Sequence, residues 1–342
     1  MQITTLGIDI GKSWFHVIGL DEAGKPVIRE KLNRARLMQF MSTRHICVVG
    51  MEACAGSQYL ARCFSAIGHD VKLIAPRFVK AYLKSNKNDF NDAAAIAEAV
   101  QRPTMRFVAV RSIDQADLQA VHRVRDQLIS ERTSVVNQIR AFLLEYGIAV
   151  PVGRCRLHKQ LPQILEAANN GLSPVMRALV HQLQTRLRRI QEEAEALEAQ
   201  IERVASQDDR CRNLRTIPGI GPLTATALVA AVGNGANFRC SRDMAAWIGL
   251  VPRQYSTGGR SRLLGISKRG NGYLRRLLIH GARSVIQNTD RAVHRFGAWL
   301  TQLETRAHSN VVAVGLANKL ARMAWAVLRN AEPYRRIGAA AA

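Results

Sequence analysis

ITTLGIDIGKSWFHVIGL, residues 3–20, decides the class of fold at the start of the chain. Residues 3–10 form an apolar run typical of a buried strand, and Gly11 and Lys12 follow it as a turn. WFHVIGL (14–20) then predicts a second strand. The turn DEAGKP and the segment VIREKL, together residues 21–32, complete a hairpin pattern. We therefore expect consecutive strands at the beginning of a sheet.

Strands and helices alternate after this hairpin. HICVVGME (45–52) and DVKLIAP (70–76) predict two further buried strands, and GSQYLARCFSAIGH (56–69) predicts a helix between them. NDAAAIAEAVQR (91–102) predicts another helix, with Asn91 as its N-cap. Three strands followed by strand–helix alternation indicate a mixed α/β sheet.

The middle of the chain is helical. Apolar side chains recur every three or four residues through 116–146 and again through 175–205, on either side of a stretch that contains Pro and Gly. This periodicity fits a coiled-coil arm and an ordinary amphipathic core helix equally well. From residue 209 onward, helices alternate with Gly-rich turns. The expected domains are 1–115, 116–208 and 209–335, followed by a disordered tail at 336–342.

Positive charge is concentrated in the last third of the chain. The protein has 49 Lys and Arg against 26 Asp and Glu, a formal net charge of +23, and residues 209–342 hold 21 basic and 5 acidic side chains. Such a balance favours a polyanionic partner, because each phosphate contact releases condensed counterions. The alternative is a solvated basic face. Between Asp243 and Asp290 no acid occurs, and the basic residues are Arg253, Arg260, Arg262, Lys268, Arg269, Arg275, Arg276 and Arg283.

Other classes of protein fit the composition less well. No uninterrupted apolar run reaches membrane-spanning length, and MQITTLGIDI has no basic region ahead of an apolar stretch. The six cysteines form no C-x-x-C pair, and no His/Cys cluster has zinc-finger spacing. We therefore expect a cytoplasmic protein with no membrane contact.

Four carboxylates come from three segments of the predicted sheet domain. Asp9 lies in a strand that a glycine turn follows, Glu52 ends the strand CVVGME, and Asp89 and Asp92 share the first turn of a helix. Sites in α/β sheets form at such strand ends. Converging carboxylates can hold two Mg²⁺ ions for phosphoryl transfer to DNA. For Asp92 alone, a helix-start acid is the alternative.

A glycine hairpin lies inside the basic third. TIPGIGPLTATALVAAVGN (216–234) has the form of a helix-hairpin-helix, in which the turn Pro218–Gly221 lets backbone N–H groups approach a phosphate. The alternative is a tight structural turn that packs Ile217 and Ile220.

A segment rich in Ser and Arg follows at 249–282. Gly258, Gly259 and Gly270 are expected to break regular structure, and hydroxyl groups stand among arginines. A serine Oγ flanked by guanidinium groups could attack a phosphodiester. On chemistry alone, a phosphate-binding loop without a covalent role is favoured, because no base stands beside the serine. The hydroxyls are Ser256, Thr257, Ser261 and Ser267.

Several motifs together resemble a known family. In chain order they are GIDIGK, GMEACAG, NKNDFNDAAAIAEA, IPGIGPLTA, AAWIGLVPRQYSTGGRSRLLGISKRGNGYLRRLLIHGAR and NKLARMAWAVLR. GIDIGK and IPGIG are weak singly, but in this order and with the long segment they are specific. Over nearly its whole length the chain resembles the DEDD transposases of the insertion-sequence "one-ten" family, in its "eleven-eleven" branch, related to the Piv and MooV DNA invertases.

The resemblance implies an N-terminal RuvC-like α/β domain of ribonuclease H fold and a helical coiled-coil insertion used in oligomerisation. It implies a mainly α-helical C-terminal transposase domain, which would contain the helix-hairpin-helix-like element. The D-E-D-D carboxylates fall on Asp9, Glu52, Asp89 and Asp92, as ligands of Mg²⁺ or alternatively Mn²⁺. Nucleic-acid contacts are expected at Lys12, Gly219, Gly221, Arg253, Arg260, Arg262, Lys268, Arg269, Arg275 and Arg276.

The resemblance also implies a nucleophilic serine that forms a transient phosphoserine link to DNA. It maps to the hydroxyl pair Ser256–Thr257, where the other branch carries a single Ser-Gly. Ser256 is chosen because a primary alcohol is the less hindered nucleophile, and Thr257 is the alternative. Metal at the carboxylates would polarise the scissile phosphate, in a composite site within or across subunits. Attack would leave a 5′-phosphoserine and a 3′-OH that attacks the partner strand's phosphoserine.

Similar family members work as tetramers guided by a structured noncoding bridge RNA, which pairs with target and donor DNA. The expected partners are therefore donor and target DNA, a bridge RNA, and further copies of this chain in a dimer to tetramer. The expected location is the bacterial cytoplasm, with association to the nucleoid when the protein is on DNA.

Three other functions compete with this one. A RuvC-like structure-specific endonuclease with metal-activated water needs the carboxylates but no serine. A non-enzymatic nucleic-acid-binding protein resembles the basic third alone and predicts no metal dependence. A metabolic kinase of the actin-like ATPase fold shares the GIDIG start but has no reason for a net charge of +16 over residues 209–342.

Overall fold

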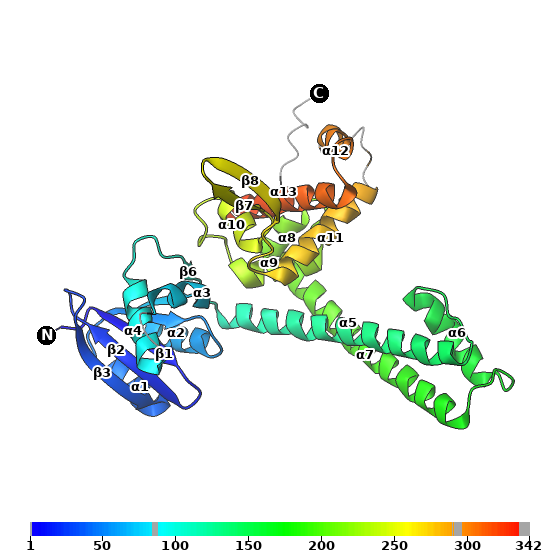
Figure 1. The fold of residues 1–342 in the computed structure, drawn as a ribbon, viewed down its shortest axis with the longest axis horizontal. Helices are drawn as coiled ribbons and strands as arrows, with labels where there is room; N and C mark the ends of the chain where they lie inside the picture. The colour runs from blue at the N-terminus through cyan, green and yellow to red at the C-terminus, as the bar shows by residue number, and fades with distance from the viewer. Residues whose placement is uncertain (1, 84–87, 289, 291–295, 335–342) are drawn as a thin grey trace. The chain divides into compact units, whose positions relative to one another are not determined.

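The protein is described by a computed structural model for residues 2–83, 88–288, 290 and 296–334. The chain divides into two compact units, Met1–Ile113 and Asp114–Ala342, which Figure 1 colours from blue to red along the sequence. Each unit has a hydrophobic core of its own. The tail predicted at 336–342 lies outside the described residues.

A six-stranded mixed sheet forms the first unit, in the order β3-β2-β1-β4-β5-β6. β1, β2 and β3 are antiparallel neighbours, β1, β4 and β5 are parallel, and β6 runs antiparallel to β5. The mixed α/β sheet expected from the sequence is thus confirmed. The strands are β1 (Thr5–Ile10), β2 (Trp14–Leu20), β3 (Pro26–Asn33), β4 (Val48–Glu52), β5 (Asp70–Ile74) and β6 (Phe107–Val108).

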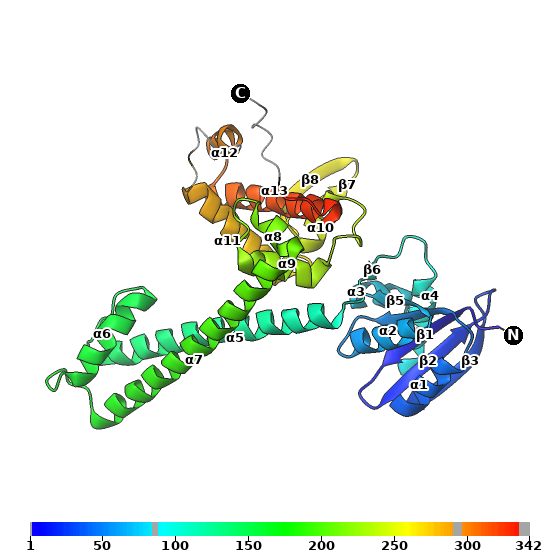
Figure 2. The ribbon, with the colours of Figure 1, turned by 180° about the vertical axis from the view of Figure 1, so that it is seen from behind.

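Helices cover both faces of this sheet (Figures 1 and 2). α1 (Arg34–Ser42) and α2 (Ser57–Ala66) pack on one face, where their apolar side chains share a core cluster with Ile8 and Met51. α4 (Asp89–Val100) packs on the other face, where its Ala residues contact Ile18. Successive residues of a strand point to opposite faces, so each strand contributes to both cores. The short α3 (Pro76–Val79) and η1 (Lys80–Tyr82) follow β5.

The start of α4 corrects one expectation. Asn88, not Asn91, is the N-cap, and its side-chain oxygen accepts a hydrogen bond of 3.0 Å from the backbone N–H of Phe90. The helix therefore begins three residues earlier than predicted. The Asn88 side chain satisfies a backbone N–H group of the first turn, which is the role expected of Asn91. As expected, Asp89 and Asp92 lie in the first turn.

Two long helices open the second unit. α5 (Ile113–Glu145) and α7 (Pro174–Gln207) bury a shared apolar stripe that includes Ile139 and Ile190. Ion pairs such as Arg125–Glu198, at 2.5 Å, join the two helices. A further helix, α6 (Arg154–Glu166), lies between them in the sequence and packs on the same cluster, so the intervening stretch is more regular than its Pro and Gly content indicated.

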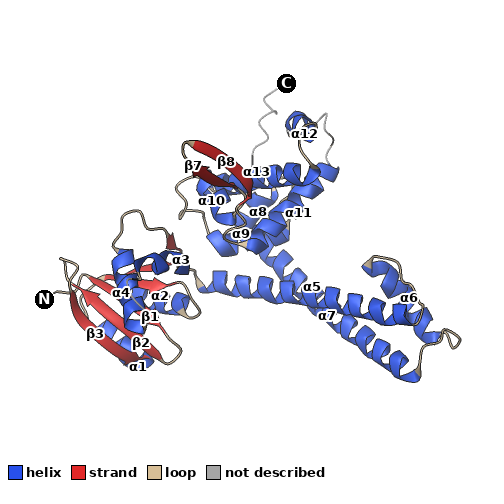
Figure 3. Ribbon diagram, in the orientation of Figure 1, coloured by secondary structure: helices blue, strands red, loops and turns tan. Residues whose placement is uncertain are grey.

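The rest of the second unit is helical apart from one hairpin (Figure 3). The core forms around α13 (Ser309–Asn330), whose Leu316, Leu320 and Ala324 are fully buried. The elements are α8 (Asp209–Arg215), α9 (Pro222–Val232), α10 (Ser241–Ile248), β7 (Pro252–Thr257), β8 (Arg260–Ile266), α11 (Gly272–Asn288), α12 (Gly297–Glu304) and α13 (Ser309–Asn330). The helical C-terminal region expected from the sequence is confirmed.

By length and composition alone, α13 could cross a membrane, and it is the single such helix in the described part of the chain. Half of its most apolar window is buried inside the protein. The helix also carries Lys319 and Arg322 within its span. These features are those of a core helix, whose apolar side chains the neighbouring helices cover.

Candidate active site and nucleic-acid interface

Asp9 faces α4 because α4 packs directly on β1 at a glycine. A Cβ added to Gly7 would lie 2.2 Å from the backbone oxygen of Ala93, so a larger residue there would push the helix away. Asp9 stands two residues beyond Gly7 and therefore shares its face of the sheet. The close contact holds the first part of α4 beside the strand end that carries this carboxylate.

Glu52 lies on the same face of the sheet as Asp9, because side chains alternate between the two faces along β4 as they do along β1. On β4, a Cβ added to Gly50 would lie 3.0 Å from the Cβ of Val100, so Gly50 faces α4, and Glu52 follows two residues later. β1 and β4 are parallel, with Ile8 paired to Met51. Asp9 and Glu52 are the next residues on adjacent strands, at the carboxyl edge where α/β sheets form their sites.

The acids near Asp9 raise its pKa. Asp9 is half-buried, and its pKa is raised to about 6, first by burial and then by the negative charges of Asp92 and Asp89. Glu52 adds a smaller contribution in the same direction, and His16 acts against it. The structure thus places the ligand oxygens of Asp9 and Asp89 within 4.8 Å of each other at one point, and the negative charges of Asp92 and Glu52 lie near enough to raise the pKa of Asp9. A cation at that point would relieve their repulsion.

His16 belongs to this cluster and was not predicted. It is paired directly with Asp9 across β1 and β2, and its Nδ1 lies 3.5 Å from Oδ2 of Asp89. Asp9, His16 and Asp89 each offer a ligand atom within 4.8 Å of the others. The tight turn after Ile10 is the sequence signal that could have predicted the position of His16, because a short hairpin connection fixes which residues stand opposite each other. Lys12 is exposed in that turn.

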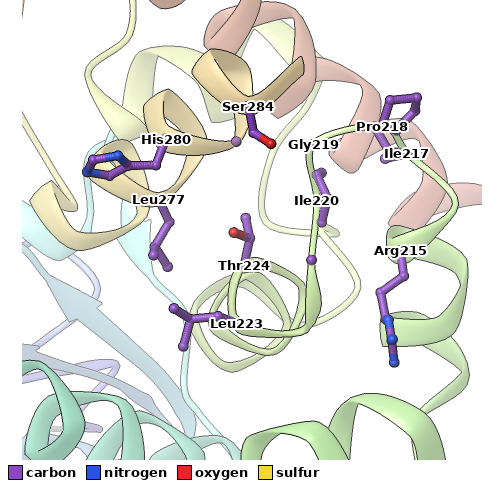
Figure 4. Close-up of a pocket in the computed structure, with 12 residues that line it drawn as sticks. Arg215, Ile217, Pro218, Gly219, Ile220, Leu223, Thr224, Leu277, His280 and Ser284 are labelled. Atoms are coloured by element: carbon purple, nitrogen blue, oxygen red, sulfur yellow. The ribbon is translucent and has the colours of Figure 1, made fainter. Parts of the chain in front are cut away.

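The glycine hairpin has the features of both alternatives given above, a tight structural turn and a turn whose backbone N–H groups could approach a phosphate. Gly219 has φ +85° and approaches α11 so closely that a Cβ would lie 2.7 Å from the Gly281 oxygen, so this glycine is needed for packing. Gly221 is the N-cap of α9, has no side-chain cap, and faces open space. Figure 4 shows the pocket of about 500 Å³ between this turn and α11, lined by Arg215, His280 and Ser284 among others. The turn can thus serve packing and leave N–H groups accessible.

The segment around Ser256 is a β-hairpin rather than an irregular loop. β7 and β8 pair antiparallel and are joined by Gly258 and Gly259, both at positive φ. As expected, these glycines interrupt regular structure, since β7 ends at Thr257 and β8 begins at Arg260. The flanking segments are strands, because two residues at positive φ form the tight turn that favours a hairpin. Both strands are exposed almost throughout.

Ser256 and Thr257 lie on opposite faces of this hairpin. Ser256 is paired with Ser261, and the amide Nε2 of Gln254 donates hydrogen bonds to both hydroxyls, at 2.8 and 3.2 Å. Thr257 is paired with Arg260 and shares its face with the Tyr255–Arg262 pair. The two candidate nucleophiles therefore have different neighbours, amide and hydroxyl in one case and guanidinium in the other.

The predicted basic residues fall into two groups. Arg275 donates to the backbone oxygens of Ile248 and Arg269, at 2.8 and 3.1 Å, and Arg276 pairs with Asp126 and lies over the Tyr273 ring. The Arg275 guanidinium thus connects backbone segments of its own unit, whereas Arg276 is exposed and makes a surface ion pair. The second group is also exposed and consists of Arg253, Arg260, Arg262, Lys268 and Arg269.

Replacing Arg262 or Arg275 by Ala is expected to have different effects. Arg262→Ala should weaken DNA binding and lower the slope of log K against log salt by about one, because one phosphate contact is lost. Arg275→Ala should lower the free energy of unfolding by about 1–3 kcal/mol, because two carbonyls lose a charged donor. Fluorescence anisotropy at several salt concentrations and urea denaturation measure the two effects. If both variants lowered the slope of log K against log salt equally, Arg275 would also contact a DNA phosphate.

An α/β sheet with acids gathered at one strand edge, in a chain that also carries a strongly basic helical unit, defines a nucleic-acid-processing enzyme. A model of the Transposase IS116/IS110/IS902 family matches residues 211–297, and the DEDD transposase model of the IS110 group matches residues 6–148. The chain belongs to the IS110/IS116 family of transposases, enzymes that cut and recombine DNA. The DEDD match indicates divalent metal use, and the carboxylate and imidazole donors around Asp9 suit such ions.

Curated relatives agree with this family over almost the whole chain. The chain is 46% identical over 326 residues to the transposase for insertion sequence element IS1328 of Yersinia enterocolitica, which covers 95% of this chain and 97% of the relative. It is 42% identical over 334 residues to the transposase for insertion sequence element IS1111A of Coxiella burnetii, covering 98% and 92%. The pilin gene-inverting protein of Moraxella bovis is 30% identical over 128 residues, covering 36% and 38%.

Proposed function

We propose that this transposase recombines DNA through a covalent serine–DNA intermediate, with Mg²⁺ or Mn²⁺ held by Asp9, Glu52, Asp89 and Asp92. The observation that carries the proposal is the contact between the end of β1 and the start of α4, where the ligand oxygens of Asp9 and Asp89 lie within 4.8 Å of each other. Burial and the negative charges of Asp92, Asp89 and Glu52 raise the pKa of Asp9 to about 6. When bound, the ions would supply Lewis-acid stabilisation for the charge that develops on a scissile phosphate.

Ser256 is the proposed nucleophile. Its Oγ forms a bond to phosphorus as the bond from phosphorus to the 3′ oxygen breaks, the serine proton is released, and the leaving oxygen takes up a proton as a 3′-OH. The Gln254 amide, which donates to Oγ at 2.8 Å, would stabilise negative charge on that oxygen. The phosphoserine conserves the energy of the diester, so that a 3′-OH of the partner strand can reseal it without ATP.

Exposed cations of the hairpin and its flanks would position the DNA. Arg253, Arg260 and Lys268 are exposed on or beside β7 and β8 and are proposed to contact phosphates near the reacting strand. The α9 N-terminus behind Gly221 would add backbone N–H donors in a helix-hairpin-helix contact. Donor and target DNA are the proposed substrates.

The finer organisation is also a proposal. We divide the chain into a RuvC-like catalytic domain (1–115), a coiled-coil arm for oligomerisation (116–208) and a serine-bearing domain (209–335). The shared apolar stripe of α5 and α7 supports the arm. The partial match to the pilin gene-inverting protein supports a relation to DNA invertases. A dimer or tetramer would work in the cytoplasm, on the nucleoid.

Guidance by a bridge RNA gives a direct test of this function. Protein freed of nucleic acid is expected to bind DNA without sequence preference, because its charge of +23 favours any polyanion. Adding RNA transcribed from the DNA flanking the gene should restore specific binding and strand exchange, and scrambled RNA should not. Electrophoretic mobility shift and recombination assays on matched and mismatched sites measure both effects. Specific exchange by the RNA-free protein would contradict guidance.

A further inference from the structure

We propose that His16 is a ligand of the same metal site, adding an imidazole nitrogen to the carboxylate oxygens of Asp9 and Asp89. The inference rests on the metal site of the proposed function and extends it beyond the four acids. It names a role for a side chain that lies outside the D-E-D-D set.

Strand register brings His16 to the cluster. In the antiparallel pair of β1 and β2, Asp9 stands directly opposite His16, and directly opposed side chains lie on the same face of the sheet. That face is the one on which α4 packs and presents Asp89. Three different elements, β1, β2 and α4, thus deliver one donor atom each to the same place.

The spacing of the donors suits one ion. The three ligand atoms lie within 4.8 Å of one another, and Nδ1 of His16 is 3.5 Å from Oδ2 of Asp89. For an octahedral ion with bonds of about 2.1 Å, neighbouring ligands lie about 3 Å apart and opposite ligands about 4 Å apart. The observed distances fall close to this range, so small side-chain adjustments would complete the coordination.

His16 differs from the other buried histidines of the described chain. Both ring nitrogens of His69 approach main-chain groups, and both of His122 approach hydroxyl groups, at distances of 3.0–3.3 Å. His16 is 7% exposed, yet its contact to Asp89 is long for a hydrogen bond. Phe90 packs edge-on against its ring, with centroids 4.7 Å apart, and so limits its orientation. A buried imidazole that faces carboxylates and has no good hydrogen bond is in an environment that suits a metal ligand.

An imidazole ligand would change the preference of the site among divalent ions. Mg²⁺ favours oxygen donors, whereas the later first-row ions accept imidazole nitrogen readily. His16 would therefore favour Mn²⁺ over Mg²⁺ relative to a site built from carboxylates alone. Loss of the imidazole should weaken Mn²⁺ binding more than Mg²⁺ binding.

Pulsed electron paramagnetic resonance of the full-length protein loaded with Mn²⁺ tests the assignment without any activity measurement. Wild type is expected to show nitrogen modulation from a directly coordinated imidazole, and the pattern should change when the histidines are labelled with ¹⁵N. His16→Gln should abolish the modulation and weaken Mn²⁺ binding about tenfold, with a smaller effect on Mg²⁺. His45→Gln is the matched control, since His45 is an exposed histidine of the same unit.

The outcomes separate this inference from the function on which it rests. Mn²⁺ that binds in a manner dependent on Asp9 but shows no nitrogen modulation would overturn the role of His16 and leave the acid site intact. Mn²⁺ affinity that is unchanged in Asp9→Asn would overturn the acid site itself. Absence of nitrogen modulation in the wild-type spectrum is decisive without any variant. Where modulation is present, circular dichroism must show that His16→Gln is folded before its loss in that variant is assigned to His16.

Discussion

Asp9→Asn is expected to reduce strand cleavage and exchange by about a thousandfold or more. The substitution keeps the size of the side chain but removes the carboxylate on which Asp92, Asp89 and Glu52 all act. Metal stabilisation of a scissile phosphate is worth several kcal/mol, and about 4 kcal/mol corresponds to a thousandfold in rate. A recombination assay with purified protein, RNA and two DNA substrates measures the loss. Glu22→Gln, an exposed acid of the same unit, should leave activity unchanged.

The free energy of unfolding of Asp9→Asn, compared with that of wild type, shows whether this variant is folded. In the absence of metal, the folded-state pKa of Asp9 is about 6 against an ordinary value of 3.8. Between these values the folded protein holds a proton that the unfolded chain has lost, so the free energy of unfolding falls as pH rises. Asn has no such proton, and Asp9→Asn should be more stable than wild type above pH 6. Because Asp9 is partly solvated, we expect a gain of about 1 kcal/mol.

Urea denaturation in EDTA at pH 4 and pH 7 measures this difference. Active Asp9→Asn protein would remove the acid cluster from the chemistry. Inactive protein that is also less stable than wild type at pH 7 would mean that Asp9 stabilises the fold and that the loss of activity is a folding effect. The expected combination, greater stability with lost activity, separates the two roles.

Ser256→Ala is expected to abolish the covalent protein–DNA adduct, whereas Thr257→Val should form it. The alternation of β7 places the two hydroxyls on opposite faces of the hairpin, so one cannot substitute for the other without turning the strand over. Both residues are exposed, and neither substitution removes buried contacts. A nicked DNA substrate that traps the intermediate, followed by denaturing electrophoresis, detects the adduct.

Two other outcomes of this experiment are informative. An adduct with Ser256→Ala but not with Thr257→Val would move the nucleophile to Thr257, on the face of Arg260 and Arg262. Metal-dependent cleavage without an adduct in wild type would favour a nuclease that uses activated water. The choice between the two hydroxyls thus also reports which face of the hairpin meets the scissile phosphate.

Much of the organisation of this protein follows from local pattern. The alternation and apolar runs of the first strands, the long helices, the acids at strand ends and the acid-free basic window were all visible in the chain. Such features depend on neighbours within a few residues, because side-chain direction repeats every two residues in a strand and every 3.6 in a helix. The break at Gly258–Gly259 belongs here too, since a two-glycine turn is a local feature, although the strands on either side of it were not predicted.

Only the tertiary structure determines which segments distant in the sequence come into contact. His16 joins the acids because the hairpin register sets it opposite Asp9 and because Gly7 admits α4 close to the sheet. Arg275 serves the fold rather than the surface because α10 presents the Ile248 carbonyl to it. In each case the chain shows which groups are present, but register and packing, which depend on the whole folded unit, determine which of them meet.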